Sequence, residues 1–147
     1  MMTKEITFNS DEYTESLKLR SDILRVPLGK KLSAADTFGE ENQLHFGCFS
    51  GDHLKGCIVA KPTENKLQVK MRQMAVATPF QGKGVGKRLI LDFEAFLTAS
   101  GVEEVVLSAR ETARIFYEKL GYDAVGEPYL EQGIEHIKMQ KNIKNGK

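Results

Sequence analysis

The stretch MAVATPFQGKGVGKRLILDFEAFL, residues 74–97, decides how the middle of this chain folds. Three glycines, Gly82, Gly84 and Gly86, stand at every second position between a short apolar run and an amphipathic one. Glycine adopts left-handed backbone conformations at little cost and lets the backbone approach a ligand closely. The first N–H groups of a helix have no partner within the helix, and its dipole is positive there. The stretch therefore predicts either an anion-binding loop or a plain turn from a strand into a helix.

Two common phosphate-binding loops do not fit this spacing. A P-loop needs G-x-x-x-x-G-K-[ST], but only three residues separate Gly82 from Gly86, and Arg88 follows Lys87 where a hydroxyl should bind magnesium. A dinucleotide fingerprint needs G-x-G-x-x-G, and Lys87 stands where its last glycine should be. The surviving interpretation is a helix start whose N–H groups, together with Lys83, Lys87 and Arg88, favour an anion such as a pyrophosphate.

The strand before the loop changes its alternation. Apolar residues occupy odd positions at first and even positions later: Leu67, Val69, Met71, Met74 and Val76. Because side chains alternate between the two faces of a strand, one apolar face is kept only if a residue is inserted near Arg72–Gln73. The pattern predicts a β-bulge there, which would free backbone groups of Met74 and Val76 for a ligand.

The rest of the chain alternates between strand-like and helix-like patterns. Apolar residues at helical spacing predict helices over Asp11–Arg25, Val85–Ala99 and Arg110–Gly121. Short apolar or alternating runs predict strands at Glu5–Phe8, Gln43–Ser50, Leu54–Ala60, Leu67–Ala77, Glu103–Ala109, Tyr122–Val125 and Gly133–Gln140. This order indicates an α+β fold, with a mixed, largely antiparallel sheet flanked by helices and a bulged central strand. We expect one domain over residues 1–147, with a frayed polar tail at 142–147.

Composition and charge narrow the class of protein. The chain has 147 residues, of which 41% are hydrophobic and 28% charged, and its net charge is +1, so no global field indicates a nucleic-acid or membrane-surface partner. No apolar run approaches the roughly 20 residues that span a bilayer. The sequence therefore predicts a cytoplasmic protein that binds neither nucleic acid nor membrane.

The cysteines are interpreted as core residues, and the arginines of the first helix as residues of a solvated face. Cys48 and Cys57 lie in strand-like apolar surroundings without zinc-site spacing, which predicts two small core residues on neighbouring strands and no metal. Arg20 and Arg25 are candidates for an anionic acceptor, but the helical pattern favours a solvated face for both.

Four segments together resemble the Gcn5-related N-acetyltransferase (GNAT) superfamily. They are RQMAV at 72–76, QGKGVGKRLI at 81–90, LSAR at 107–110 and FYEKLGY at 116–122. The family motif Q/R-x-x-G-x-G/A, which follows a bulged strand and opens a helix, corresponds here to Gln81-Gly82-Lys83-Gly84-Val85-Gly86. The resemblance implies that this loop holds the pyrophosphate of acetyl-CoA, and that the chain is a GNAT-like acetyltransferase without a metal.

The resemblance also implies roles for individual residues. Tyr117 stands where the family places a tyrosine that protonates the sulfur of CoA, although an aromatic core residue would also fit this position. Arg110 departs from the family, where many relatives have an asparagine three residues before the alanine that corresponds to Ala113. The residues expected to bind the cofactor are Met74, Ala75, Val76, Gln81, Gly82, Lys83, Gly84, Val85, Gly86, Lys87, Arg110, Ala113 and Phe116.

The sequence indicates the general base of the reaction less clearly than the general acid. A lysine-like amine is about 99.9% charged at pH 7, so a base must take a proton before the amine can attack. His136, in GIEHIKM, is the candidate because histidine titrates near neutral pH, but it could instead be structural. Glu111, Glu131 and an ordered water are the alternatives.

The leading functional hypothesis is transfer of an acetyl group from acetyl-CoA to a primary amine of a small molecule or a protein. A non-catalytic acyl-CoA-binding module and an acyltransferase for longer acyl groups are the alternatives. The acceptor and the oligomeric state, with a homodimer as one option, stay open at this point.

Overall fold

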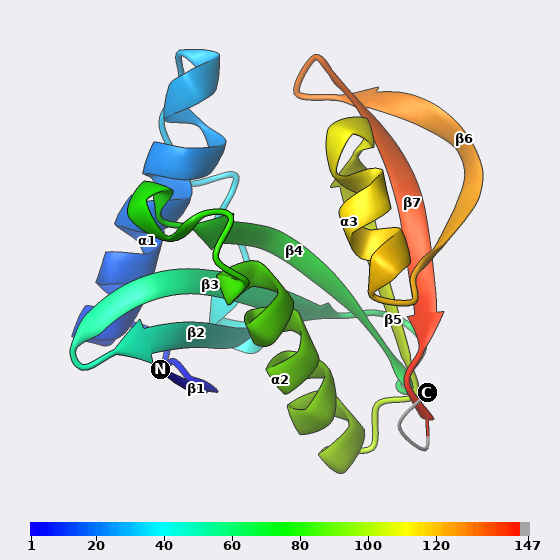
Figure 1. The fold of residues 1–147 in the computed structure, drawn as a ribbon, viewed down its shortest axis with the longest axis horizontal. Coiled ribbons are helices and arrows are strands. Elements are labelled where there is room, and N and C mark those ends of the chain that lie inside the picture. Colours follow the sequence, from blue (N-terminus) through cyan, green and yellow to red (C-terminus); the bar gives the residue numbers. More distant parts are fainter. Residues whose placement is uncertain (145–147) are drawn as a thin grey trace. The chain divides into compact units, whose positions relative to one another are not determined.

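The computed structural model describes residues 1–144, which fall into two compact units (Figure 1). The first contains residues 1–61 and 73–94, and the second contains residues 62–72 and the chain from 95 onward. The strands in the described residues are β1 (Met2–Glu5), β2 (Leu44–Ser50), β3 (His53–Pro62), β4 (Gln68–Val76), β5 (Glu104–Arg110), β6 (Asp123–Glu131) and β7 (Ile134–Asn142). The α-helices are α1 (Asp11–Leu24), α2 (Val85–Ala99) and α3 (Arg114–Lys119). The interpretation of residues 1–147 as one domain stays a prediction.

Four short 3₁₀ turns complete the described structure: η1 (Val26–Leu28), η2 (Glu40–Asn42), η3 (Thr78–Phe80) and η4 (Glu111–Ala113). Strand pairing is antiparallel for β1–β2 and β2–β3 in the first unit, and for β5–β7 and β6–β7 in the second. The β4–β5 pair, from Gln68 to Met71 on β4, is parallel. The predicted fold class, α+β with a largely antiparallel mixed pairing, is confirmed.

In the first unit, α1 and α2 cover opposite faces of β2 and β3 (Figure 1). Tyr13 of α1 packs with Phe49, Leu54 and Cys57 in one apolar cluster. On the other face, Phe46 of β2 stacks on Phe93 of α2 with ring centroids 4.8 Å apart. Alternating side chains of one strand thus reach two different helices, which is why both faces of β2 and β3 are apolar.

Helix α2 begins and ends where the sequence predicts, at Val85 and Ala99. Its apolar face is fully buried, and Gly101, with φ 92, follows its last turn as the predicted C-terminal glycine. Gly56 on β3 faces this helix: a Cβ placed there would make ordinary contact with Val85 at 3.4 Å and Leu89 at 3.5 Å, and only the backbone carbonyl of Ala75, at 3.2 Å, would be crowded. The start of α2 is therefore seated directly on the sheet of its own unit.

The bulge predicted in β4 is present at Gln73, whose φ of 51 interrupts the extended backbone of the strand. The cysteine prediction is also confirmed: Cys48 and Cys57 are buried free thiols on the paired strands β2 and β3. Burial raises the pKa of Cys57 to about 12, so its thiol stays protonated and unreactive at neutral pH.

In the second unit, α3 lies beside β5 and β6, and β6 and β7 form a long hairpin (Figure 1). Tyr122, Ile137 and Met139 are almost completely buried within this unit. The strand after α3 runs from Asp123 to Glu131 and is longer than the predicted Tyr122–Val125.

Two predicted elements have wrong boundaries. Strand β1 covers Met2–Glu5 and not Glu5–Phe8, because the chain turns at Thr7–Asn9, where Asn9 has a positive φ. The predicted helix Arg110–Gly121 is divided into η4 and the shorter α3.

The predicted frayed tail at 142–147 is also partly wrong. Ile143 is 1% exposed, its N–H donates to the carbonyl of Glu103 at 2.9 Å, and its carbonyl accepts from the hydroxyl of Thr98. The apolar side chain of Ile143 explains the difference, because a polar tail would gain nothing from burial. Residues 145–147 lie outside the described part of the chain.

Candidate functional site

The glycine loop connects β4 to α2 within the first unit. At the beginning of the loop, the side-chain amide of Gln81 donates a hydrogen bond to the carbonyl of Val76 on β4 at 2.9 Å. This bond holds the start of the loop against the strand. Gly82 and Gly84 have φ values of 74 and 80, and no heavy atom lies within 4 Å of where a Cβ would be at either residue. The left-handed backbone at these two positions favours glycine, and the open space beside them leaves the backbone accessible to a ligand.

The end of the loop is also the N-terminus of α2. Arg88 donates its backbone N–H to the carbonyl of Gly84 at 3.0 Å, so the N–H groups of Val85, Gly86 and Lys87 precede the first intrahelical hydrogen bond of the helix. Val85 and Leu89 are buried beneath the loop and hold the helix start in place. The backbone therefore presents a fixed set of donors at the positive end of a helix dipole.

Positive side chains surround this helix start. Lys83 and Lys87 are exposed. Arg88 instead pairs with Asp92 at 3.0 Å, and the same Asp92 oxygen accepts from the hydroxyl of Thr3 at 2.7 Å. Among the three cations that the sequence indicated, Lys83 and Lys87 are therefore the better candidates for an anion at the loop. The predicted loop residues therefore form one local arrangement at the start of α2, with two exposed lysines beside it.

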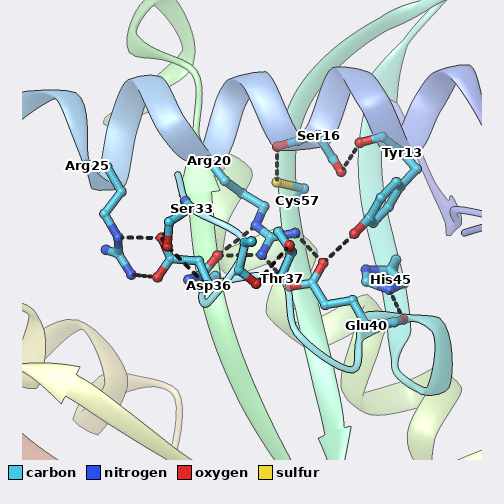
Figure 2. A network of polar contacts seen from close by, with 12 residues as sticks. Tyr13, Ser16, Arg20, Arg25, Ser33, Asp36, Thr37, Glu40, His45 and Cys57 are labelled. Carbon is cyan, nitrogen blue, oxygen red and sulfur yellow. Dashed lines mark hydrogen bonds and ion pairs between the residues drawn. The ribbon is translucent and has the colours of Figure 1, made fainter. Parts of the chain in front are cut away.

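A buried polar network lies on the α1 side of the first unit (Figure 2). Arg20 and Glu40 are both 0% exposed and form a bidentate ion pair, in which Nη1 donates to Oε1 at 2.8 Å and Nη2 donates to Oε2. Tyr13 adds a hydrogen bond from its hydroxyl to Glu40 Oε1 at 2.7 Å. Burial, followed by the hydrogen bond to Glu40, raises the pKa of Tyr13 to about 12.

The expectation of a solvated helix face for Arg20 and Arg25 is wrong. Arg20 lies in the interior, and Arg25 is largely buried against Asp36, with Nη2 3.0 Å from Oδ1. The reason is the connection between α1 and β2, which folds back over the helix and supplies a carboxylate to each arginine (Figure 2). Neither arginine is therefore free to meet an anionic acceptor in the way that the sequence suggested.

Breaking the buried pair is expected to cost much of the stability of the protein. Replacing Arg20 by Met leaves the Glu40 carboxylate buried without its cation, which typically costs about 3–5 kcal/mol. We expect a loss of that size in the free energy of unfolding, measured by urea denaturation. Lys18→Met on the same helix is the matched control, since the Lys18–Asp22 pair is exposed and should change stability by less than about 1 kcal/mol. Equal losses in the two variants would contradict this account.

Tyr117 lies on α3 in the second unit and is partly buried. Its ring meets Phe116 and Tyr122 edge to face, with centroids 5.1 and 5.8 Å away. Burial raises the pKa of Tyr117 to about 12, so the hydroxyl keeps its proton at neutral pH. This environment holds the ring in one orientation and the hydroxyl in its donating form.

The other predicted residues of this unit lie around η4. Arg110 ends β5, is half-buried and stands opposite His136 in the β5–β7 pair. Ala113 and Phe116 are half-buried as well. Glu111, an alternative base, accepts from Arg114 at 3.4 Å through Oε1, while its buried Oε2 atom has no hydrogen-bond partner among the described residues.

His136 is 7% exposed and lies on β7. Its Nδ1–H donates to the carbonyl of Ile134 at 2.8 Å, an assignment that follows because a carbonyl only accepts. Nε2 then carries the lone pair of the neutral ring and lies 3.4 Å from Glu131 Oε2, and the ring stacks on Tyr129. With Nδ1 engaged by a backbone carbonyl, Nε2 is the ring nitrogen that faces a carboxylate side chain.

Three residues of polar clusters are not indicated by the sequence as functional residues: Glu40, Gln73 and Tyr129. Gln73 accepts two hydrogen bonds from Arg20, and Tyr129 makes a short hydroxyl contact with Ser108. Only the bulge at Gln73 had a signal in the sequence, because Glu40 lies in a polar connection without periodicity.

In residues 1–144 no group of three or more His, Cys, Asp and Glu side chains is arranged to hold a metal ion. No described helix combines the length and apolarity needed to cross a bilayer.

Comparison with known proteins defines the class. Residues 27–143 match the family model described as an acetyltransferase (GNAT) domain. The chain therefore belongs to the GNAT acetyltransferase family, as its motifs predict. Its relatives include the uncharacterized N-acetyltransferase YitI of Bacillus subtilis, which is 30% identical over 73% of this chain and 76% of that protein.

Solved structures agree at the level of the fold. A putative N-acetyltransferase from Lactobacillus plantarum matches with a TM-score of 0.83 and 20% identity, over 97% of this chain and 99% of that one. An aminoglycoside 6'-N-acetyltransferase complexed with coenzyme A matches with a TM-score of 0.78 and 22% identity, over 97% of each chain.

Proposed function

We propose that this protein transfers an acetyl group directly from acetyl-CoA to a primary amine of a small molecule or a protein. The observation that carries the proposal is the glycine loop, in which two left-handed glycines open directly onto the N-terminus of α2. Such a loop suits the pyrophosphate of CoA. Membership of the GNAT family supports the proposal, as does the bound coenzyme A of the similar aminoglycoside acetyltransferase.

In this proposal, the loop residues 81–87 bind the pyrophosphate through backbone N–H groups, with Lys83 and Lys87 adding positive charge. Backbone groups of Met74, Ala75 and Val76 on β4 bind the thioester carbonyl and the pantetheine arm. Residues between the end of β5 and the first turn of α3 bind the remainder of the cofactor: Arg110, Ala113 and Phe116. Each of these groups can act without a metal, because N–H groups and lysines neutralise a pyrophosphate directly.

The reaction forms an N–C bond and breaks the C–S bond of the thioester. The amine must first lose a proton, which costs about 4–5 kcal/mol at pH 7 for a lysine-like amine. His136 takes this proton on Nε2, and Tyr117 donates a proton to the departing thiolate. Binding both substrates next to each other lowers the barrier further, since it converts a bimolecular step into an effectively unimolecular one.

The role of His136 is testable through the pH dependence of activity. We expect His136→Gln to lower kcat/KM for a good amine several-fold. If His136 is the base, the inflection that its protonation produces in the plot of kcat/KM against pH should also disappear. Gln keeps a polar side chain on β7, so the fold and CoA binding should stay intact. Steady-state rates over a range of pH, together with calorimetry of CoA binding, measure both effects.

His53→Gln is the matched control, because His53 is exposed on β3 in the other unit and should leave the pH profile unchanged. A His136→Gln profile that overlays the parent's would contradict the assignment. The base would then be Glu111, Glu131, an ordered water or bulk solvent.

An unbiased screen of amines with acetyl-CoA, with detection of the released thiol, tests the function as a whole. The similarity to known proteins does not identify the amine that accepts the acetyl group in this protein. Thiol release with an amine supports the transferase. Binding of CoA without turnover of any amine or acyl-CoA would instead indicate a non-catalytic acyl-CoA-binding module. The cytoplasmic location, the absence of nucleic-acid and membrane partners and a homodimeric state stay predictions.

A further inference from the structure

Gln73 has an unusual backbone for a residue within a strand. Three non-glycine residues among 1–144 have a positive φ: Asn9, Gln73 and Gln132. The first and last of them lie in turns, whereas Gln73 lies inside β4. A left-handed conformation is unfavourable for a residue with a side chain, so contacts around Gln73 must supply the free energy that holds it.

Arg20 makes that contact. Its Nε donates to Gln73 Oε1 at 2.8 Å, and its Nη2 donates to the same oxygen. Because a guanidinium group only donates, the atom facing it must be the amide oxygen. The amide group of Gln73 is thereby held in one orientation, with its nitrogen directed away from Arg20.

Arg20 is itself held on its other side. The Glu40 carboxylate accepts from both terminal nitrogens of Arg20 and also from the Tyr13 hydroxyl. Arg20 and Glu40 are 0% exposed, so water does not compete for these hydrogen bonds. Arg20, Glu40 and Gln73 thus form a support that runs from α1 through η2 to the bulge in β4. The Tyr13 hydroxyl is not part of this path, because it donates to Glu40 and not to Gln73.

We propose that Arg20 is a positioning residue for acetyl transfer. Through Gln73 it holds the left-handed bulge and so sets the direction of the neighbouring backbone groups of Met74. The catalytic meaning of this support rests on the proposed function, in which Met74 contacts the thioester carbonyl. The hydrogen bonds from Arg20 to Gln73 belong to the structure of the protein itself, so they can be tested without any ligand.

The first experiment reads the backbone of residue 73 by NMR in the free protein. Left-handed and extended backbones give Cα secondary chemical shifts of opposite sign. We expect the left-handed sign in the parent, and a change toward the extended sign in Gln73→Met, which has no acceptor for Arg20. Gln73→Glu should restore the left-handed sign, because a carboxylate oxygen accepts from the guanidinium group as the amide does. A left-handed Gln73→Met would overturn the proposal.

The second experiment measures acetyl-CoA turnover with an amine identified by the screen. We expect Arg20→Lys, which retains a cation beside Glu40 but loses the planar set of donors, to lower kcat about 10–100-fold. The Kd for CoA should change only a few-fold, because the glycine loop is untouched and CoA lacks the thioester carbonyl that Met74 contacts in the proposed function. Tyr13→Phe is the control: it removes a hydrogen bond to Glu40 without touching Gln73, and we expect it to leave kcat near the parent value.

The outcomes separate the two proposals. A parent protein that neither binds CoA nor turns over acetyl-CoA overturns the proposed function, and the positioning role in catalysis falls with it, whereas the NMR shifts still decide whether Arg20 holds the bulge. A parent that is active, together with an Arg20→Lys variant of unchanged kcat, overturns the positioning role alone. Equal loss of kcat in Arg20→Lys and Tyr13→Phe also overturns it, since the effect would then be general loss of structure.

Discussion

Replacing Gly84 by Asp is expected to weaken CoA binding at least 100-fold. The carboxylate would stand in the glycine loop, at the place where the backbone N–H groups of α2 meet the pyrophosphate, and would oppose its negative charge. The variant should still fold, because no heavy atom lies within 4 Å of the new Cβ and aspartate tolerates a positive φ better than most residues. Isothermal titration calorimetry with CoA in the presence of EDTA measures the effect and excludes help from a metal.

Gly84→Asn is the matched control for this variant. Asparagine has nearly the same shape and the same tolerance of a φ near 80, but it carries no charge. We expect it to weaken CoA binding about tenfold or less. If Asp and Asn weaken binding equally, bulk and not charge is responsible, and if neither weakens it, CoA binds elsewhere.

Tyr117→Phe is expected to lower kcat about 10–10³-fold with little change in the KM for acetyl-CoA. General-acid catalysis typically contributes about 10²–10⁴-fold, and the substitution removes the hydroxyl while keeping the ring against Phe116 and Tyr122. Because burial raises the pKa of Tyr117 to about 12, the hydroxyl should stay protonated at every pH up to about 10. In the unmodified protein, kcat should therefore not fall between pH 7 and pH 10 through ionisation of the Tyr117 hydroxyl. Rapid-quench or steady-state rates under conditions where chemistry limits turnover provide the measurement.

Tyr129→Phe is a suitable comparison, because it removes a hydroxyl from an exposed part of β6 in the same unit. We expect it to leave kcat within a few-fold of the parent. An unchanged kcat in Tyr117→Phe would make Tyr117 a packing residue of α3, and thermal unfolding of the same variant would then be the only property to change.

The elements predicted best are those whose pattern is local and continuous. Helix α2 has apolar residues at helical spacing from its first turn to its last, and glycines bound it on both sides, so its limits agree with the structure. The bulge at Gln73 was visible because a shift of one residue moves every later side chain to the other face of a strand. The loop between them follows from glycine spacing alone.

The elements predicted poorly depend on contacts with distant residues. Arg20 looks like a solvated residue on a helix, because nothing within α1 indicates a partner. Its partner Glu40 lies twenty residues later, in a connection without periodicity, and only folding brings the carboxylate to the guanidinium group. Similarly, Ile143 is buried because Thr98 and Glu103 lie beside it, although the residues around it are polar.

The sequence by itself determined the family, the glycine loop, helix α2 and the bulged strand, because each depends on residues that are close together in the chain. The tertiary structure alone decided which charges are buried, which nitrogen of His136 faces a backbone carbonyl, and which residues contact Gln73 at the bulge. The physical reason is that burial of a charge is tolerated only beside a partner. The partner comes from whichever segment folds back against it, and that choice is not encoded in the local pattern of either segment.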